Sequence, residues 1–362
     1  MNDIQHNNVS PGAGCQPVYM KKRRGAGFWV AVGLASFFFL CTLLLFVLFI
    51  GSLVLSKAVI TGATTKKAMK HASETVIEGS GENKVAIIPI KGILSNESAE
   101  GLFIEKPSIV DVVKQQLEQA ADDTHVKAVL LEVDSPGGGI TASDIIYNQI
   151  IKFKAGTQKK VVVYMQDIAA SGGYYISSAA DAIVAHPTTI TGSIGVIMPL
   201  INVAELINRY GIKDNSIASG NLKEIGSPLK QMTADESAIL KGIIDEMYMQ
   251  FVTVVSAGRK LDIEAVKKIA DGRIYTGKQA FEKGLVDQLG YLEDAITVTK
   301  KLAGLTEATI VRYEKHYGLA DLFGLMSKKL FLNNTIKLDI SQLQEQGDTR
   351  PMYLWNGYSM KE

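Results

Sequence analysis

The run from Gly25 to Leu55 contains no charged residue, and it constrains the fold of this chain more than any other feature. A helix needs about 20 apolar residues to cross the hydrocarbon core of a bilayer, so this run can span one with some tilt. A cleaved signal peptide would have a shorter apolar core followed by a small-residue cleavage site. The length therefore favours an uncleaved transmembrane signal anchor.

Basic residues flank the apolar run on both sides. The compact cluster Lys21-Lys22-Arg23-Arg24 precedes it, whereas the lysines that follow, from Lys57 to Lys70, are dispersed. Because basic residues are enriched on the cytoplasmic side of membrane spans, the compact cluster favours a cytoplasmic N-terminus. We therefore expect a single-pass protein of the cell membrane, with its main domain on the extracytoplasmic side.

Composition excludes several classes of chemistry. The net charge of +1 over 362 residues gives no global field that would attract nucleic acid. Cys15 and Cys41 cannot form a disulfide framework, and the five histidines are scattered without an HExxH or paired-ligand spacing. We therefore expect no metal site, and no nucleotide or organic cofactor is indicated.

Beyond the anchor, short apolar runs alternate with segments of helical periodicity. Strands that alternate with helices in this way are typical of parallel βαβ units with right-handed crossovers, so the sequence predicts an α/β fold. Capping boxes at Thr233–Glu236 and Thr276–Gln279 predict the starts of two later helices. The expected strands are 84–90, 127–133, 160–165, 182–185 and 194–198, and the expected early helices are 109–121 and 140–153.

A polar tripeptide, Ser171-Gly172-Gly173, separates a strand-like run from a segment that begins a helix. A serine at such a junction can be exposed at a sheet edge beside the free amides of a helix N-terminus, which is how many hydroxyl nucleophiles are held. A small residue selected for close packing beside two glycines explains Ser171 equally well when it is considered alone.

Two further segments have both a chemical and a structural interpretation. Asp134-Ser-Pro-Gly-Gly-Gly139 directly follows a strand, and consecutive glycines let backbone amides approach a developing negative oxygen. A tight strand-to-helix turn explains these glycines as well, and no phosphate-loop pattern is present. Lys223 lies between turn residues in the segment 219–228, which suggests a fixed side chain, although a loop lysine is usually a solvated charge.

Together these segments resemble the signal peptide peptidase A family of membrane-bound serine proteases, within the Clp protease/crotonase fold group. The resemblance covers about Lys84 to Leu305 and implies a Clp protease/crotonase-like spiral of ββα units. Five motifs carry it in family order: DSPGGG at 134–139, ASGGYY at 170–175, TGSIGV at 191–196, SGxxKxxGSP at 219–228 and GRIYTGKQAFEKGLVDQLG at 272–290.

The resemblance implies a role for individual residues. Ser171 corresponds to the nucleophile, Lys223 to the general base, and Gly138 and the amide of Gly172 to the oxyanion donors. Ser193 corresponds to a hydroxyl that supports the lysine. The family also implies an acyl-enzyme mechanism, peptide substrates such as remnant signal peptides, and a homo-oligomeric ring, expected to be an octamer, in which subunits share active sites.

A lysine base must lose its proton, although its ordinary pKa is about 10.4. Burial in an apolar cleft or a neighbouring positive charge lowers the pKa of a lysine toward neutrality. A carboxylate beside the amine would have the opposite effect. We therefore expect the carboxylate of Glu224 to point away from the amine of Lys223.

Other interpretations stay open at this point. A Ser-His-Asp triad would use His186, and Ser135 is a second, weaker candidate for the nucleophile because proline follows it. A catalytically silent membrane scaffold of the same fold and a crotonase-type acyl-CoA enzyme are alternatives from other functional classes. The anchor and the segment 219–228 argue against both of them.

The expected organisation has five parts, and the last contains an apolar segment at Met352–Trp355. We expect this segment to dock on a neighbour or to occupy a substrate groove as an extended strand, and we expect the specificity pocket to take small or aliphatic side chains. The parts are a cytoplasmic disordered tail at 1–24, the transmembrane signal anchor at 25–55, a linker at 56–83, the peptidase domain at 84–305 and a C-terminal extension at 306–362.

Overall fold

The computed structural model describes residues 25–61, 72–100, 105–314 and 351–355. The chain divides into two units, residues 1–68 and 69–362, and each is described by itself. The expected tail and most of the expected C-terminal extension lie outside the described residues.

The described residues of the first unit form the helix α1 (Ala26–Thr61). Its segment Gly27–Ile50 has a mean hydropathy of 2.7 and is long and apolar enough to cross a membrane. Every peptide hydrogen bond of a helix is internal, which is why an apolar run of this length can form one in lipid. The prediction of an apolar N-terminal helix is confirmed.

The second unit is built on a nine-stranded sheet in the order β1-β12-β2-β5-β7-β8-β11, with β9 pairing with β7 and β10 with β9. The pairs from β12 through β11 are parallel, as the alternation of strands and helices predicts, whereas β1 and β10 are antiparallel to their neighbours. The strands are β1 (Ser73–Glu78), β2 (Lys84–Lys91), β5 (Val126–Ser135), β7 (Lys160–Ala170), β8 (Ala182–Ala185), β9 (Ile190–Gly192), β10 (Ile274–Thr276), β11 (Gln288–Leu289) and β12 (Thr309–Glu314).

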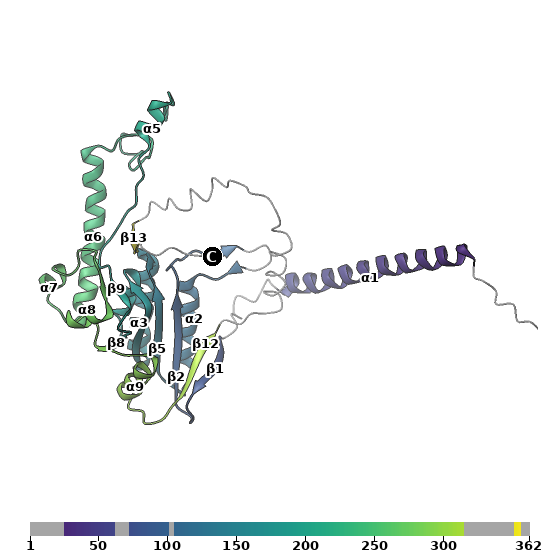
Figure 1. The fold of residues 1–362 in the computed structure, drawn as a ribbon, viewed down its shortest axis with the longest axis horizontal. Helices are drawn as coiled ribbons and strands as arrows, with labels where there is room; N and C mark the ends of the chain where they lie inside the picture. The colour runs from purple at the N-terminus through teal and green to yellow at the C-terminus, as the bar shows by residue number, and fades with distance from the viewer. Residues whose placement is uncertain (1–24, 62–71, 101–104, 315–350, 356–362) are drawn as a thin grey trace, which may run out of the picture. The chain divides into compact units, whose positions relative to one another are not determined.

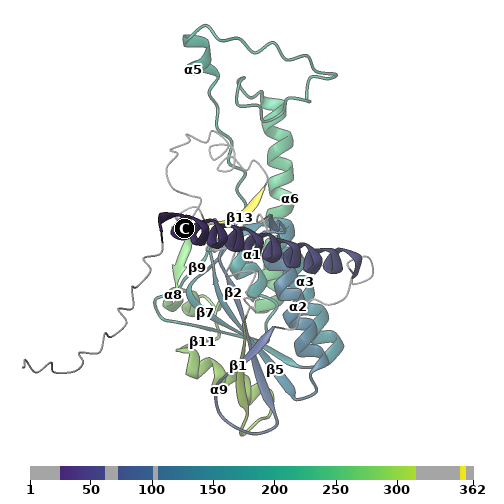
Figure 2. The same ribbon diagram turned by 90° about the vertical axis from the view of Figure 1, so that its right-hand side faces the viewer.

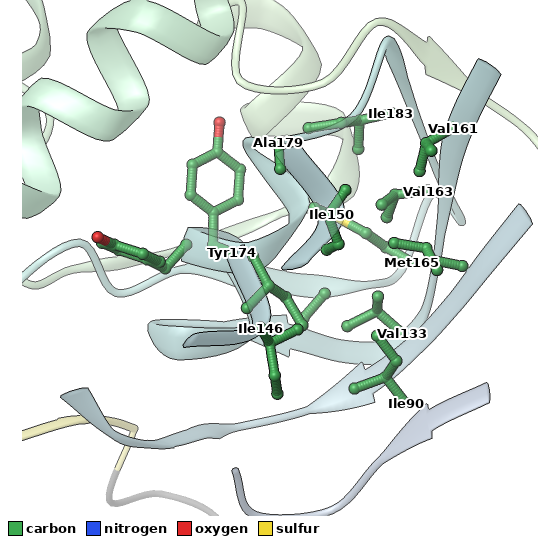
Figure 3. Packing of buried hydrophobic residues seen from close by; sticks show 14 of the residues in the cluster. Ile90, Val133, Ile146, Ile150, Val161, Val163, Met165, Tyr174, Ala179 and Ile183 are labelled. Atoms are coloured by element: carbon green, nitrogen blue, oxygen red, sulfur yellow. The ribbon is translucent and has the colours of Figure 1, made fainter. Parts of the chain in front are cut away.

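Helices cover both faces of this sheet (Figures 1 and 2). The larger core packs strand residues against α2, α3, α4 and α6, and Figure 3 shows Tyr174 and Ile146 among strand side chains such as Val133 and Met165. The smaller core packs the opposite face against α9. The helices are α2 (Ile109–Asp122), α3 (Ile140–Thr157), α4 (Gly172–Ser177), α5 (Ala204–Arg209), α6 (Ala234–Arg259), α7 (Ile263–Lys267), α8 (Gly277–Glu282) and α9 (Leu292–Leu302).

Short strands complete the described structure outside the main sheet. β3 (Ala99–Glu100) pairs with β4 (Glu105–Lys106), and β6 (Gly137–Gly139) pairs with β13 (Met352–Leu354). Both predicted capping boxes are confirmed, at Thr233 for α6 and at Thr276 for α8.

Two strands of the main sheet lie outside the expected peptidase domain, 84–305. β1 lies in the expected linker, 56–83, and β12 lies in the expected extension, 306–362, yet both are paired in the sheet. β1 escaped prediction because it is an edge strand with mostly exposed residues, so its sequence shows no buried face. The strand expected at 194–198 is instead β9, three residues long and slightly earlier in the chain.

Candidate active site

Ser171 lies where β7 ends and α4 begins, with a backbone conformation that side-chain-bearing residues rarely adopt. Its φ of 52° and ψ of −116° cost of order 1–3 kcal/mol and are held by the surroundings. The Ser171 amide donates to Gly192 O at 2.8 Å, and the Ser171 carbonyl accepts from the Tyr175 amide at 2.8 Å. A strained strand-to-helix turn of this kind is typical of a nucleophilic serine.

The glycine loop lies beside Ser171 because β5 and β7 are parallel neighbours. Ser135 at the end of β5 is in register with Ala169 of β7, so the carboxyl ends of both strands meet at one edge. A Cβ on Gly137 would lie 2.6 Å from the amide nitrogen of Gly172, and one on Gly172 would lie 2.5 Å from Ser143 Oγ. A Cβ on Gly137 would collide with backbone and one on Gly172 with the buried Ser143 hydroxyl, so both positions require glycine.

Leu94 bonds the backbone on either side of Gly138, the other expected oxyanion donor. The Leu94 amide donates to Gly137 O at 2.8 Å, and Leu94 O accepts from the Gly139 amide at 2.9 Å. A Cβ on Gly138 would lie 2.2 Å from Leu94 O. The sequence did not identify Leu94, because its contribution comes entirely from the backbone.

Ser135, the second candidate for the nucleophile, has a structural role in this loop. It is fully buried, and its hydroxyl donates to Gly92 O at 2.6 Å while accepting from the Gly137 amide at 3.1 Å. A hydroxyl engaged in this way fixes the shape of the glycine turn and is not free to attack a substrate.

The strand β13 lies across this site as a peptide would. Tyr353 is opposite Gly138 in the antiparallel pair with β6, and on its other side Met352 exchanges two backbone hydrogen bonds with Ile197, at 2.8 and 3.1 Å. The Tyr353 carbonyl oxygen would lie 2.0 Å from a Cβ on Gly137, the position that also approaches the Gly172 amide. The segment Met352–Leu354 is therefore an extended strand against the glycine loop, with its Tyr353 carbonyl close to Gly172.

The side chain of Tyr353 fills an aromatic pocket between α4 and α6. Its ring stacks on Tyr175, with centroids 5.0 Å apart, and lies 4.7 Å from the ring of Phe251. Its hydroxyl donates to Met247 O at 2.8 Å, and burial raises the pKa of this phenol. The expectation that the specificity pocket takes small or aliphatic side chains stays a prediction.

A polar network that reaches the surface supports the pocket wall. The Tyr175 hydroxyl donates to Asp144 Oδ1 at 2.7 Å, and the side-chain amide of Gln250 donates to the same oxygen at 2.9 Å. Burial, reinforced by the bond to Asp144, raises the pKa of Tyr175, so its hydroxyl stays protonated as a donor. The network fixes the orientation of the ring on which Tyr353 stacks.

Ser193 follows β9 and also has a left-handed backbone, with φ of 50°. Its amide donates to Arg273 O at 2.8 Å, it is 7 % exposed, and it lines a cavity of about 540 Å³. The carbonyl oxygen of Gly192, the residue directly before Ser193, accepts a hydrogen bond from the Ser171 amide. The structure thus brings Ser193 next to the strand end that holds Ser171.

Lys223 is not brought to Ser171 within one chain. It is exposed on a turn between α5 and α6, in the segment that lies at the end of α6 remote from the sheet (Figures 1 and 2). Within the described residues no hydrogen bond or ion pair joins it to Ser171. The carboxylate of Glu224 lies 4.0 Å from Lys230 Nζ, which also bonds Glu236 at 2.6 Å.

His186, the base of the alternative triad, is engaged elsewhere. Its Nδ1 lies 2.8 Å from the Thr188 hydroxyl, and its ring contacts Tyr291 edge-on at 4.9 Å. No hydrogen bond to Ser171 is found in the part of the chain that the structure describes. In that same part, no group of three or more His, Cys, Asp or Glu side chains could hold a metal ion.

Comparison with known proteins identifies the class. Residues 154–306 match the model of peptidase family S49. A relative from Enterococcus faecium, assigned by name to signal peptide peptidase SppA, is 37 % identical over 305 residues, which cover 82 % of this chain and 85 % of the relative. Protease 4 of Haemophilus influenzae is 35 % identical over 64 % of this chain and 36 % of its own length. The chloroplastic serine protease SPPA of Arabidopsis thaliana is 30 % identical over 71 % and 39 %.

These matches and the α/β fold define the chain as a serine peptidase. It belongs to peptidase family S49, the family of the SppA proteins, as its five motifs predicted.

Proposed function

We propose that this chain is a membrane-anchored serine endopeptidase that uses a Ser171/Lys223 dyad completed by a neighbouring subunit. The observation that carries the proposal is a peptide strand, β13, lying across a strained serine, with its Tyr353 carbonyl against the glycine loop. An endopeptidase must bind a chain extended on both sides of the scissile bond, and β13 is extended through this site. The expected Clp protease/crotonase-like spiral remains part of this proposal.

The chemistry proceeds in two acyl-transfer steps. Ser171 Oγ attacks the scissile carbonyl carbon while its proton passes to the neutral amine of Lys223. The amides of Gly138 and Gly172 stabilise the oxyanion, and collapse of the tetrahedral intermediate expels the leaving amine, which takes the proton from Lys223. Water then hydrolyses the acyl-enzyme by the same route and regenerates Ser171.

Exposed apolar side chains on the segment around Lys223 support the proposal that copies of this chain form an oligomer. Ile201, Tyr210 and Ile217 are 71, 74 and 101 % exposed. Soluble domains rarely present such residues together unless the surface binds a partner. Because Lys223 is on this same segment, a second copy of the chain is the occupant that would both cover the apolar surface and bring a base to Ser171. The ring, expected to be an octamer, follows if the contact repeats head to tail.

The membrane anchor determines on which side of the membrane the site would bind its substrates. The helix α1 is long and apolar enough for one membrane crossing, and the basic cluster before it favours a cytoplasmic N-terminus. The site would then face peptides on the extracytoplasmic side, close to the membrane. Remnants of cleaved signal peptides are substrates of that kind, and an aromatic pocket suits their apolar side chains.

Subunit mixing tests the proposal most directly. Ser171→Ala and Lys223→Ala, purified separately in detergent, should each lose peptidase activity by about 10³-fold or more. Unfolded and reassembled together at equal amounts, they should regain about a quarter of the wild-type rate, because that share of interfaces pairs an intact serine with an intact lysine. The matched control is Lys213→Ala, an exposed lysine of the same segment, which should retain full activity.

Two outcomes would contradict the proposal. If mixing restores nothing while Lys223→Ala alone is inactive, the dyad is not shared between subunits. If a serine-directed phosphonate labels Ser171→Ala as well as the wild type, Ser171 is not the nucleophile.

A further inference from the structure

A cavity of about 540 Å³ lies at the end of β13, beyond the residue that fills the aromatic pocket. The loop after β9, the end of β13, one turn of α6 and the loop after α7 form its walls, and the two acyl-transfer steps proposed above use none of their side chains. The lining includes Ser193, Ile244, Tyr248, Gly272 and, from the end of β13, Leu354 and Trp355.

The register of β13 defines which substrate residue would lie at this cavity. The carbonyl of Tyr353 is at the glycine loop, Leu354 follows opposite Gly137, and the Trp355 amide donates to Pro136 O at 3.0 Å. The bond after Tyr353 is thus in the position of the scissile bond. Trp355 then occupies the position of the second residue of the leaving group.

The same face of α6 lines both positions. Side chains alternate along an extended strand, so Tyr353 and Trp355 project to the same side. Tyr353 contacts Met247 and Phe251, whereas Tyr248 and Ile244, the latter about one turn nearer the start of α6, line the cavity beside Trp355. Two successive side-chain sites along one helix match the spacing of alternate residues in an extended peptide.

The charged groups of the cavity wall are already paired. Arg273 donates from Nε to both carboxylate oxygens of Asp271 at 2.8 Å, and this bond lowers the pKa of Asp271 to about 2. Asp245 forms an ion pair with Lys241 one turn away on α6. With both carboxylates compensated, the wall offers no free negative charge to select a basic side chain.

We propose that this cavity is a leaving-group subsite that selects a large aromatic side chain at the second position after the scissile bond. The inference rests on the proposed peptidase function of Ser171 and adds a specificity determinant on the far side of the cleaved bond. Tyr248 and Ile244 provide the contact surface, and Trp355 of the chain itself marks the position that a substrate side chain would take.

The test uses full-length protein in detergent and a set of quenched peptides with tyrosine before the scissile bond. The peptides differ only at the second residue after that bond, which is Trp, Leu, Gly or Arg, and mass spectrometry of the products verifies the cleavage position. We expect kcat/KM to fall at least about 10-fold from Trp to Gly, the scale on which apolar pockets discriminate. Arg should be no better than Gly.

Variants of the cavity wall assign the selectivity to this site. Tyr248→Ala should abolish the preference for Trp over Gly, whereas Tyr248→Phe should keep it, since the contact is apolar. Ile239→Ala, at an exposed residue of α6 outside the cavity wall, is the matched control and should retain the preference. Thermal unfolding of each variant verifies that it is folded, and the peptide series on the wild type decides the question even if Tyr248→Ala is unstable.

The outcomes separate this inference from the proposed function. Cleavage of all four peptides at equal rates would contradict the proposed subsite but not the proposed peptidase function. A preference for Arg would have the same meaning. A preference for Trp that persists in folded Tyr248→Ala overturns the assignment to this cavity. If no peptide is cleaved and Ser171 is not labelled by a phosphonate, both proposals fail together.

Discussion

Replacing Gly138 by alanine should disable the site without disturbing the serine. A Cβ at this position would lie 2.2 Å from Leu94 O and 2.7 Å from Leu94 N, whereas ordinary contact begins at 3.4 Å. Leu94 cannot retreat easily, because its amide and carbonyl both bond the glycine loop, at 2.8 and 2.9 Å. The loop itself must therefore shift, and the Gly138 amide with it.

The expected magnitude follows from this displacement. A misplacement of about 1 Å near the reacting atoms costs about 10²-fold in rate. Loss of one oxyanion donor costs about 10²–10³-fold in kcat, equivalent to about 3–4 kcal/mol. We therefore expect kcat of Gly138→Ala to fall by about 10²–10³-fold, with a much smaller change in KM, since the donor acts mainly on the transition state.

The neighbouring glycine provides a matched control. A Cβ on Gly139 would meet Leu94 O at 3.7 Å and the Ala142 side chain at 3.8 Å, both ordinary contacts. Its φ of −61° is open to any residue. Gly139→Ala should therefore keep kcat within a few-fold of the wild type when both variants are assayed on a quenched peptide in detergent. Rates for Gly138→Ala and Gly139→Ala that agree within about threefold would refute the assignment of Gly138 as a donor.

Three other predictions address the C-terminal segment, a partly buried carboxyl and a helix cap. Truncation after Asp348 should raise kcat/KM for short peptides, because β13 then no longer competes for the groove. Unchanged assembly and an unchanged rate would exclude both roles expected for Met352–Trp355, docking on a neighbour and occupying a substrate groove. Asp134, whose pKa is raised by burial, binds its proton more tightly in the folded state. Its ionisation therefore destabilises the fold as pH rises through that raised pKa, so Asp134→Asn should raise the melting temperature at pH 7, with a gain that shrinks below about pH 4. A gain of equal size at pH 3 and pH 7 would contradict this. Thr233→Ala removes the hydroxyl that accepts from the Glu236 amide and should cost about 1 kcal/mol in urea unfolding, whereas no loss would mean that α6 does not depend on its cap.

The features of the candidate site that depend on local order could be predicted from the sequence. Gly138 and Ser171 each follow a strongly apolar run, and parallel strands bring their carboxyl ends to one edge, so the juxtaposition of the two motifs could be foreseen. The capping residues Thr233 and Thr276 were equally visible, because a hydroxyl followed three residues later by Glu or Gln is a local signal. In each case the interaction lies within a few residues or follows from strand direction alone.

The remaining features depend on contacts that are distant in sequence. Phe251 belongs to the apolar stripe of α6, and periodicity cannot distinguish a stripe that fills a core from one that lines a pocket. The register of β13 on β6 joins residues more than 200 positions apart, and Leu94 acts only through its backbone. Sequence patterns report side-chain character, so they could not reveal either contact.

The position of Lys223 is connected to the pocket through α6. Glu224, its neighbour, is at ion-pair distance from Lys230, which bonds Glu236 in the capping box at the start of α6. Further along the same helix, Phe251 lines the pocket that Tyr353 fills. One continuous helix thus joins the segment that would deliver the base to a neighbouring subunit and the wall that contacts Tyr353.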